Sequence, residues 1–137
     1  MGVVVDTSAL IALKRAGVRI EERLLEHGDE PAVIPAIVYA ELQVGARLAE
    51  DAERATLRRA RIEALVERVP IVEFDRAIAD RWADLFADLT LAGTMIPAND
   101  LQVAATGLHL DFAVLLGPMG EAHYAKVPGL KLVRLTV

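Results

Sequence analysis

Three acidic side chains stand where carboxylates could act together on a substrate. Asp6 follows the apolar run 3–5 and precedes a helical pattern, Glu41 lies inside a second helical pattern, and Asp100 follows Pro97 in the first turn of a third. In an open α/β sheet the ligand site lies beyond the carboxyl ends of the strands, so acids from three elements could converge there. Mg²⁺ is held by such carboxylates, with waters and substrate phosphates filling its other positions. The pattern therefore predicts a divalent metal acting on a phosphodiester.

Each acid also has a simpler interpretation. Asp6 is a good N-cap for the helix that follows it. Glu41 projects from a mainly apolar helix face, and a carboxylate buried there needs a partner, which is either a metal ion or an arginine. Asp100 is favoured in a first helical turn by the helix dipole, and Asn99 beside it is a candidate cap.

The elements that must position these acids follow from the apolar periodicity. Strands are predicted at residues 3–5, 32–34, 69–72, 113–116 and 130–133, and helices at 9–15, 19–27, 36–48, 50–68, 75–92 and 97–109. Strands that alternate with helices and read as continuous apolar runs are typical of a parallel sheet covered on both faces. The sequence therefore predicts an α/β fold with a short central parallel sheet.

The composition limits the functions that the chain can have. With 137 residues and 54% hydrophobic content, a single globular domain over residues 1–137 is expected. Apolar runs stay below the roughly 18 residues of a membrane span, so no membrane association is expected. The lack of cysteine excludes thiolate chemistry and fits the reducing cytoplasm. A net charge of −5 argues against a protein that simply coats nucleic acid.

Four short motifs occur in order along the chain. They read VVDTSAL (residues 4–10), PAIVYAEL (35–42), PANDLQVAAT (97–106) and VPGL (127–130). Each is weak alone, but together they resemble the PIN domain, and specifically toxins of the VapC type. The resemblance covers essentially the whole chain.

The resemblance implies an α/β/α sandwich and an endoribonuclease that depends on Mg²⁺ or Mn²⁺. It implies inhibition by a VapB-type antitoxin, a homodimer, and structured RNA such as transfer RNA as the substrate. It places Asp6, Glu41 and Asp100 on the family's metal-binding acids, and Thr7 or Ser8 on its neighbouring hydroxyl.

One segment departs from the family pattern. Members usually carry a fourth acid or an asparagine a few residues before a His-Phe pair, whereas this chain has Gly120 at that place, before His123-Tyr124. The fourth ligand is therefore missing or is supplied by the adjacent Glu121. A second class of function stays open for this reason: a PIN-like module that binds RNA or a protein without cleaving.

Basic side chains on two helical segments are candidates for contact with RNA phosphates. Arg54, Arg58 and Arg61 form a stripe at helical spacing, and Lys14 with Arg15 ends the first helix. Interspersed acids make a solvated helix face the competing interpretation.

Two further interpretations concern other classes of protein and the partner. A phosphatase with a nucleophilic aspartate is disfavoured because Ser8, not a second aspartate, stands two residues after Asp6. The helical hairpin expected over residues 36–68 is the predicted antitoxin contact, because it is long and carries apolar residues. The three histidines show no ligand spacing, so each is expected to be structural or exposed.

Overall fold

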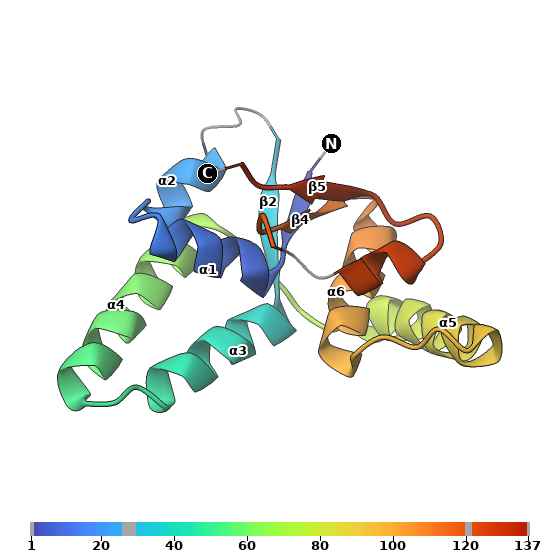
Figure 1. Cartoon of the computed structure of the whole chain (residues 1–137), viewed down its shortest axis with the longest axis horizontal. Helices are drawn as coiled ribbons and strands as arrows, with labels where there is room; N and C mark the ends of the chain where they lie inside the picture. The colour runs from blue at the N-terminus through green and yellow to red at the C-terminus, as the bar shows by residue number, and fades with distance from the viewer. Residues whose placement is uncertain (1, 26–29, 120–121, 137) are drawn as a thin grey trace.

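The computed structural model describes residues 2–25, 30–119 and 122–136, in which β-strands alternate with α-helices (Figure 1). The strands are β1 (Val3–Val5), β2 (Ala32–Pro35), β3 (Ile71–Val72), β4 (Ala113–Leu116) and β5 (Leu132–Arg134). The helices are α1 (Thr7–Arg15), α2 (Ile20–Leu25), α3 (Ala36–Arg47), α4 (Ala52–Arg68), α5 (Arg76–Ala92), α6 (Ala98–Leu110) and the 3₁₀ helix η1 (Ala122–Lys126).

The five strands form one parallel sheet in the order β3-β2-β1-β4-β5. Val4 of β1 is in register with Val33 on one side and Val114 on the other. Along the chain, β2 and β3 are added on one side of β1, and β4 and β5 then follow on its other side. Since ligands bind where such a strand order reverses, the carboxyl ends of β1 and β4 mark the expected site.

Helices cover both faces of this sheet, which confirms the predicted α/β class. In Figure 1, α1 to α4 lie on one side of the strands and α5 with α6 on the other. Val4 and Val114 of the central strands are fully buried, and a single hydrophobic cluster joins them to Leu135 near the end of the described chain. Burying each side chain of this size stabilises the fold by about 1.5–3 kcal/mol. None of the helices in the described ranges combines the length and apolarity that a membrane crossing requires.

Two strands are shorter than the apolar runs predicted. Val69 caps α4 by donating its backbone N–H to Leu65, and Pro70 has no N–H to donate, so β3 is confined to 71–72 rather than 69–72. Gly129 adopts a left-handed φ of 78°, and the turn around it delays β5 to 132–134 rather than 130–133. Both corrections come from turn geometry at the strand ends.

Candidate active site

Asp6 is buried at the junction between β1 and α1, with 5% of its surface exposed. Its Oδ2 accepts hydrogen bonds from the Ser8 backbone N–H at 3.0 Å and from Ser8 Oγ at 2.6 Å. The capping interpretation is therefore confirmed, because Asp6 is the N-cap of α1. Capping uses one oxygen of the carboxylate and leaves Oδ1 facing the neighbouring elements.

The end of β4 passes very close to this cap. The Gly117 N–H donates to Ser8 Oγ at 3.0 Å, and a Cβ added at Gly117 would lie 2.5 Å from the Ser8 carbonyl oxygen. Only glycine allows this approach of backbone to backbone. Ser8 therefore joins Asp6 to the end of β4, which explains the glycine at position 117.

Tyr124 joins Asp6 to Asp100. Its hydroxyl donates to Asp6 Oδ1 at 2.7 Å and lies 3.2 Å from Asp100 Oδ1, and the residue has no exposed surface. Burial and the two carboxylates raise the pKa of Tyr124 above its ordinary value, so the hydroxyl keeps its proton and acts as a donor. Side chains from the β1–α1 junction, α6 and η1 thus meet at one point.

Asp100 lies in the first turn of α6, as predicted, and has a second partner there. Its Oδ2 is hydrogen-bonded to His123 Nε2, and both side chains are largely buried. The adjacent Asn99 is exposed and lies inside the helix, whose N-cap is Pro97 without any side-chain cap bond. The expectation that Asn99 caps α6 is therefore wrong, because the helix begins one residue before it.

Glu41 projects from α3 toward the start of α1. Its Oε1 accepts a hydrogen bond from Thr7 Oγ1 at 3.1 Å. Burial, above all, raises the pKa of Glu41; the Thr7 bond opposes this shift, and the charges of Asp100 and Asp6 add to it. Within the described chain no arginine forms an ion pair with Glu41, so the arginine interpretation is not supported.

Asp6, Glu41 and Asp100, named here the acidic cluster, can accept a divalent ion without forming a closed cage. Among the residues that the structure describes, no three acidic or histidine side chains form a ready-made metal site. Mg²⁺ and Mn²⁺ do not need one, because Mg²⁺ binds through one or two carboxylates and keeps several waters. Ser8 donates two hydrogen bonds to Asp6 Oδ2. Among the described residues Oδ1 accepts only from Tyr124, so an acceptor position remains. The carboxylate oxygens of the acidic cluster are hard donors that fit Mg²⁺ or Mn²⁺. Glu121, which the sequence offers as the supplier of the fourth ligand, lies outside the described residues.

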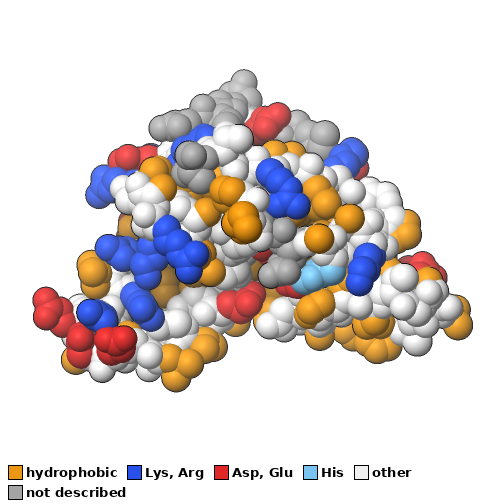
Figure 2. Space-filling model, in the orientation of Figure 1, with side chains coloured by type: hydrophobic (Ala, Val, Ile, Leu, Met, Phe, Trp, Pro, Cys, Tyr) orange, Lys and Arg blue, Asp and Glu red, His pale blue; other side chains and the backbone are white. Residues whose placement is uncertain are grey.

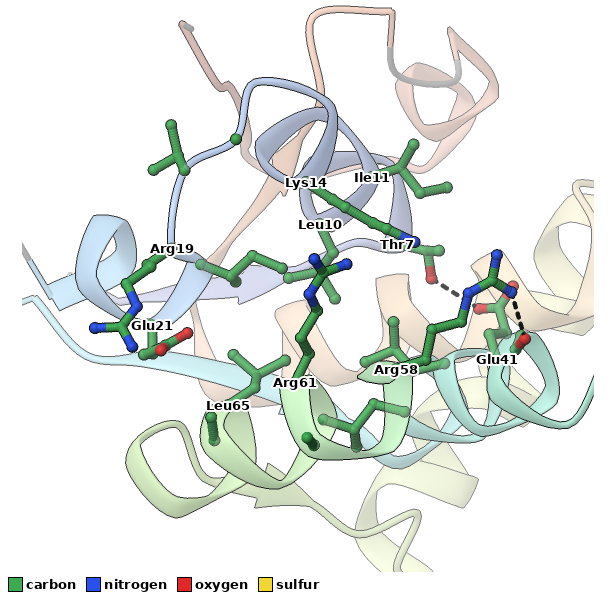
Figure 3. Close-up of a pocket in the computed structure, with 18 residues that line it drawn as sticks. Thr7, Leu10, Ile11, Lys14, Arg19, Glu21, Glu41, Arg58, Arg61 and Leu65 are labelled. Atoms are coloured by element: carbon green, nitrogen blue, oxygen red, sulfur yellow. Dashed lines mark hydrogen bonds between the residues drawn. The ribbon is translucent and has the colours of Figure 1, made fainter. Parts of the chain in front are cut away.

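A groove of about 720 Å³ begins at Glu41 and runs between α1, α2, α3 and α4. Lys14, Arg58 and Arg61 line it, and their side chains extend into the same space (Figure 3). Desolvation, followed by the charges of Arg58 and Arg61, lowers the pKa of Lys14. We call this feature the basic groove. The leucine and isoleucine side chains that line the basic groove are Leu10, Ile11, Ile20, Leu42, Ile62 and Leu65.

The cations predicted to contact RNA divide into two groups. Lys14 and Arg58 line the basic groove, and Arg58 also donates to the Gly45 carbonyl at 2.6 Å. Arg54 is instead ion-paired on the exposed face of α4, where its partners are Glu50 and Asp51. Arg15 is exposed at the end of α1 and is not among the residues that line the groove.

Charge is distributed unevenly over this face of the molecule. Figure 2 shows Lys and Arg side chains gathered over the α1 and α4 side, with acidic side chains at its outer edge and further acidic and histidine side chains near the centre. The basic groove thus adjoins the acidic cluster at Glu41, although the net charge of the chain is −5.

The sequence reasoning missed Tyr124 and His123 as members of the site. The available signal was the His-Phe pair of the family pattern, in which this chain has a tyrosine at the second position. A hydroxyl added to a buried ring requires a polar partner, and the carboxylates nearby supply it.

The chain belongs to the PIN-domain family, whose model matches residues 3–116. It is 28% identical over 102 residues to Ribonuclease VapC4 of Mycobacterium tuberculosis, covering 74% of this chain and 75% of that protein. Asp6, Glu41 and Asp100 lie within the matched segment, whereas Tyr124 lies beyond it.

Solved structures agree on the fold along the whole chain. The VapBC2 structure from Rickettsia felis, bound to a promoter DNA fragment, matches with a TM-score of 0.83 at 19% identity, covering 99% of this chain and 100% of the other. VapBC-1 from nontypeable Haemophilus influenzae matches with a TM-score of 0.79 at 26% identity, covering 98% of each chain. Together the comparisons support a nuclease of the PIN toxin class.

Proposed function

We propose that the protein is an endoribonuclease that uses Mg²⁺ or Mn²⁺ and acts as the toxin of a toxin–antitoxin pair. The observation that carries this proposal is the convergence of Asp6 and Asp100 on one hydroxyl, with Glu41 close enough for both charges to raise its pKa. The VapC ribonuclease relative supports the same activity.

The acidic cluster would hold the metal and leave the substrate side open. A bound Mg²⁺ or Mn²⁺ supplies positive charge to the scissile phosphate and lowers the pKa of a bound water. Asp6 is fixed by Ser8 and Tyr124, Asp100 by Tyr124 and His123, and Glu41 by Thr7. Because these donors set the carboxylate orientations before substrate arrives, little reorganisation is needed at the moment of reaction.

The basic groove would bind the RNA backbone beside the scissile bond. Lys14, Arg58 and Arg61 carry like charges at close quarters, and the pKa of Lys14 is lowered first by desolvation and then by the charges of the two arginines. Phosphates placed among them would relieve the repulsion between these charges and add affinity that falls with salt. Since the groove begins at Glu41, RNA lying in it would reach the acidic cluster.

The proposed activity is tested by incubating the purified protein with total RNA under Mg²⁺, Mn²⁺ or EDTA. Asp6→Asn and Asp100→Asn variants, purified in the same way, reveal any contaminating nuclease. Cleavage that needs metal and disappears in both variants supports the proposal. Intact RNA under every condition, including transfer RNA as a defined substrate, favours the binding module that the missing fourth acid leaves open.

A VapB-type antitoxin is the proposed inhibitor, and the α3–α4 hairpin is the proposed contact. The hairpin exposes Val44, Leu48 and Leu57, with 54%, 77% and 50% of their surfaces accessible. The structurally similar VapBC-5 from Mycobacterium tuberculosis is a member of the VapBC family of toxin–antitoxin systems, which supports a partner of this kind. Leu48→Asp is expected to weaken capture of the antitoxin encoded beside this chain, and unchanged capture would count against the hairpin.

We also propose a homodimer, on the family resemblance. Light scattering of the purified chain across a concentration series tests it, and a mass that stays at one chain contradicts it.

A further inference from the structure

Tyr124 touches both acids at the centre of the site. Its single hydroxyl hydrogen is shared between two acceptors. The hydrogen bond to Asp6 Oδ1, at 2.7 Å, is shorter and stronger than the bond to Asp100 Oδ1, at 3.2 Å. The phenol ring is fully buried among the core side chains, so the hydroxyl has little freedom to turn away. The contact to Asp6 joins residues 118 positions apart in the chain.

The two carboxylates need such a group. Two acids oriented toward one point repel each other, and a metal-free site must offset that repulsion by protonation, by a counter-charge or by a shared donor. A neutral hydroxyl supplies the donor without adding charge. It also restricts how each carboxylate can rotate, which orients the oxygens that remain available.

We propose that the Tyr124 hydroxyl is a positioning group that holds Asp6 and Asp100 in the orientation in which they bind the divalent ion. This inference rests on the proposed function and adds a residue that the matched segment 3–116 does not contain. Tyr124 acts through the two carboxylates, as an outer partner of metal ligands, and not on the substrate.

The substitution Tyr124→Phe isolates this role. It removes one oxygen atom and keeps the buried ring, so the packing of η1 against the core is preserved. Tyr39→Phe is a matched control, because Tyr39 accepts a hydrogen bond from Gln43 on the same helix, α3, and is not bonded to the acidic cluster. Thermal unfolding in EDTA confirms that both variants fold.

The experiment measures Mn²⁺ binding directly, from the electron paramagnetic resonance signal of free Mn²⁺ in equilibrium with the protein. Loss of an outer hydrogen-bond partner typically weakens metal affinity by about 10- to 100-fold, and Tyr124→Phe is expected to fall in that range. Tyr39→Phe is expected to match the unsubstituted chain. The Mg²⁺ concentration that gives half-maximal RNA cleavage shifts by the same factor, and saturating Mg²⁺ restores the rate.

Mn²⁺ binding by Tyr124→Phe that equals or exceeds that of the unsubstituted chain overturns the inference, because the hydroxyl would then be irrelevant or a competitor of the metal. Equal weakening by Tyr39→Phe also overturns it. Either of these two outcomes leaves the proposed function intact, provided that the unsubstituted chain binds Mn²⁺ and cleaves RNA. If it binds no Mn²⁺ at all, the inference and the proposed metal chemistry fail together.

Discussion

The acidic cluster and the basic groove adjoin each other at Glu41, but their side chains are held in different ways. The Asp6 carboxylate is buried and, within the described residues, accepts three hydrogen bonds, from Ser8 twice and from Tyr124. Arg61 extends from the exposed face of α4 into the groove. The acids are therefore fixed before any ligand binds, whereas the cations lie close enough together for Arg58 and Arg61 to lower the pKa of Lys14.

This difference separates the residues expected to act in cleavage from those expected to bind RNA. Catalytic groups must be held within a fraction of an ångström, which requires buried donors from several elements. Phosphate-binding cations need only the right charge in the right region, because backbone contacts depend little on exact geometry. Substitutions should therefore act on the rate and on metal affinity in the acidic cluster, and on RNA affinity in the basic groove.

The largest effect is expected from Asp6→Asn. The amide keeps the size and the N-cap of the side chain but removes the charge that would hold the metal, so cleavage should fall by more than about 100-fold. Single-turnover cleavage of a labelled RNA measures the change. If the variant folds and keeps more than a tenth of the rate, Asp6 is not a metal ligand.

Loss of charge in the basic groove is expected to have an intermediate effect. Lys14→Gln combined with Arg61→Gln should lower RNA affinity about tenfold and reduce the salt dependence of binding by about one unit of slope per cation. The rate at saturating RNA should change little. Arg54→Gln is the control, since Arg54 is already paired with acids on α4, and an equal loss in that variant would remove the distinction between groove and helix surface.

Thr7→Val is expected to have a smaller effect, on the acidic side. Removing the 3.1 Å bond to Glu41 frees that carboxylate to rotate, so the Mg²⁺ concentration for half-maximal cleavage should rise by about tenfold or less. Thr7→Ser keeps the hydroxyl and should restore the original Mg²⁺ requirement. No shift in Thr7→Val would show that Glu41 is oriented by something else.

The smallest effect concerns the stability of the metal-free protein. The pKa of Glu41 is raised in the fold, so its ionisation destabilises the folded state as the pH rises above the ordinary pKa of glutamate, and the loss is complete above the raised pKa. In EDTA, Glu41→Gln should therefore melt at a higher temperature than the unsubstituted chain at pH 7. The gap should close as the pH falls toward about 4, near the ordinary pKa of glutamate. A variant that melts lower at pH 7 would contradict the sign of the shift.

The positions of Asp6, Glu41 and Asp100 could be predicted because each lies next to an apolar run or within a helical period. Those local signals fix the elements, and the parallel α/β arrangement brings their ends together. Strand order could not be derived, because it depends on long-range pairing that one sequence does not display.

The partners of the acids could not be predicted for the same reason. Tyr124 reaches Asp6 across 118 positions, and no local pattern distinguishes a bridging tyrosine from a core one. The stripe of Arg54, Arg58 and Arg61 on α4 was visible, but its division between paired and groove-lining side chains depends on how α4 packs against the helices around it.

The most direct test compares metal occupancy with cleavage in one titration. Mn²⁺ is added to metal-free protein, bound Mn²⁺ is followed by magnetic resonance, and cleavage of a labelled RNA is followed in parallel samples. Cleavage is predicted to rise in proportion to occupancy, and Asp100→Asn is predicted to lose both. Cleavage that persists in metal-free protein, or full occupancy without cleavage of any RNA offered, would contradict the account.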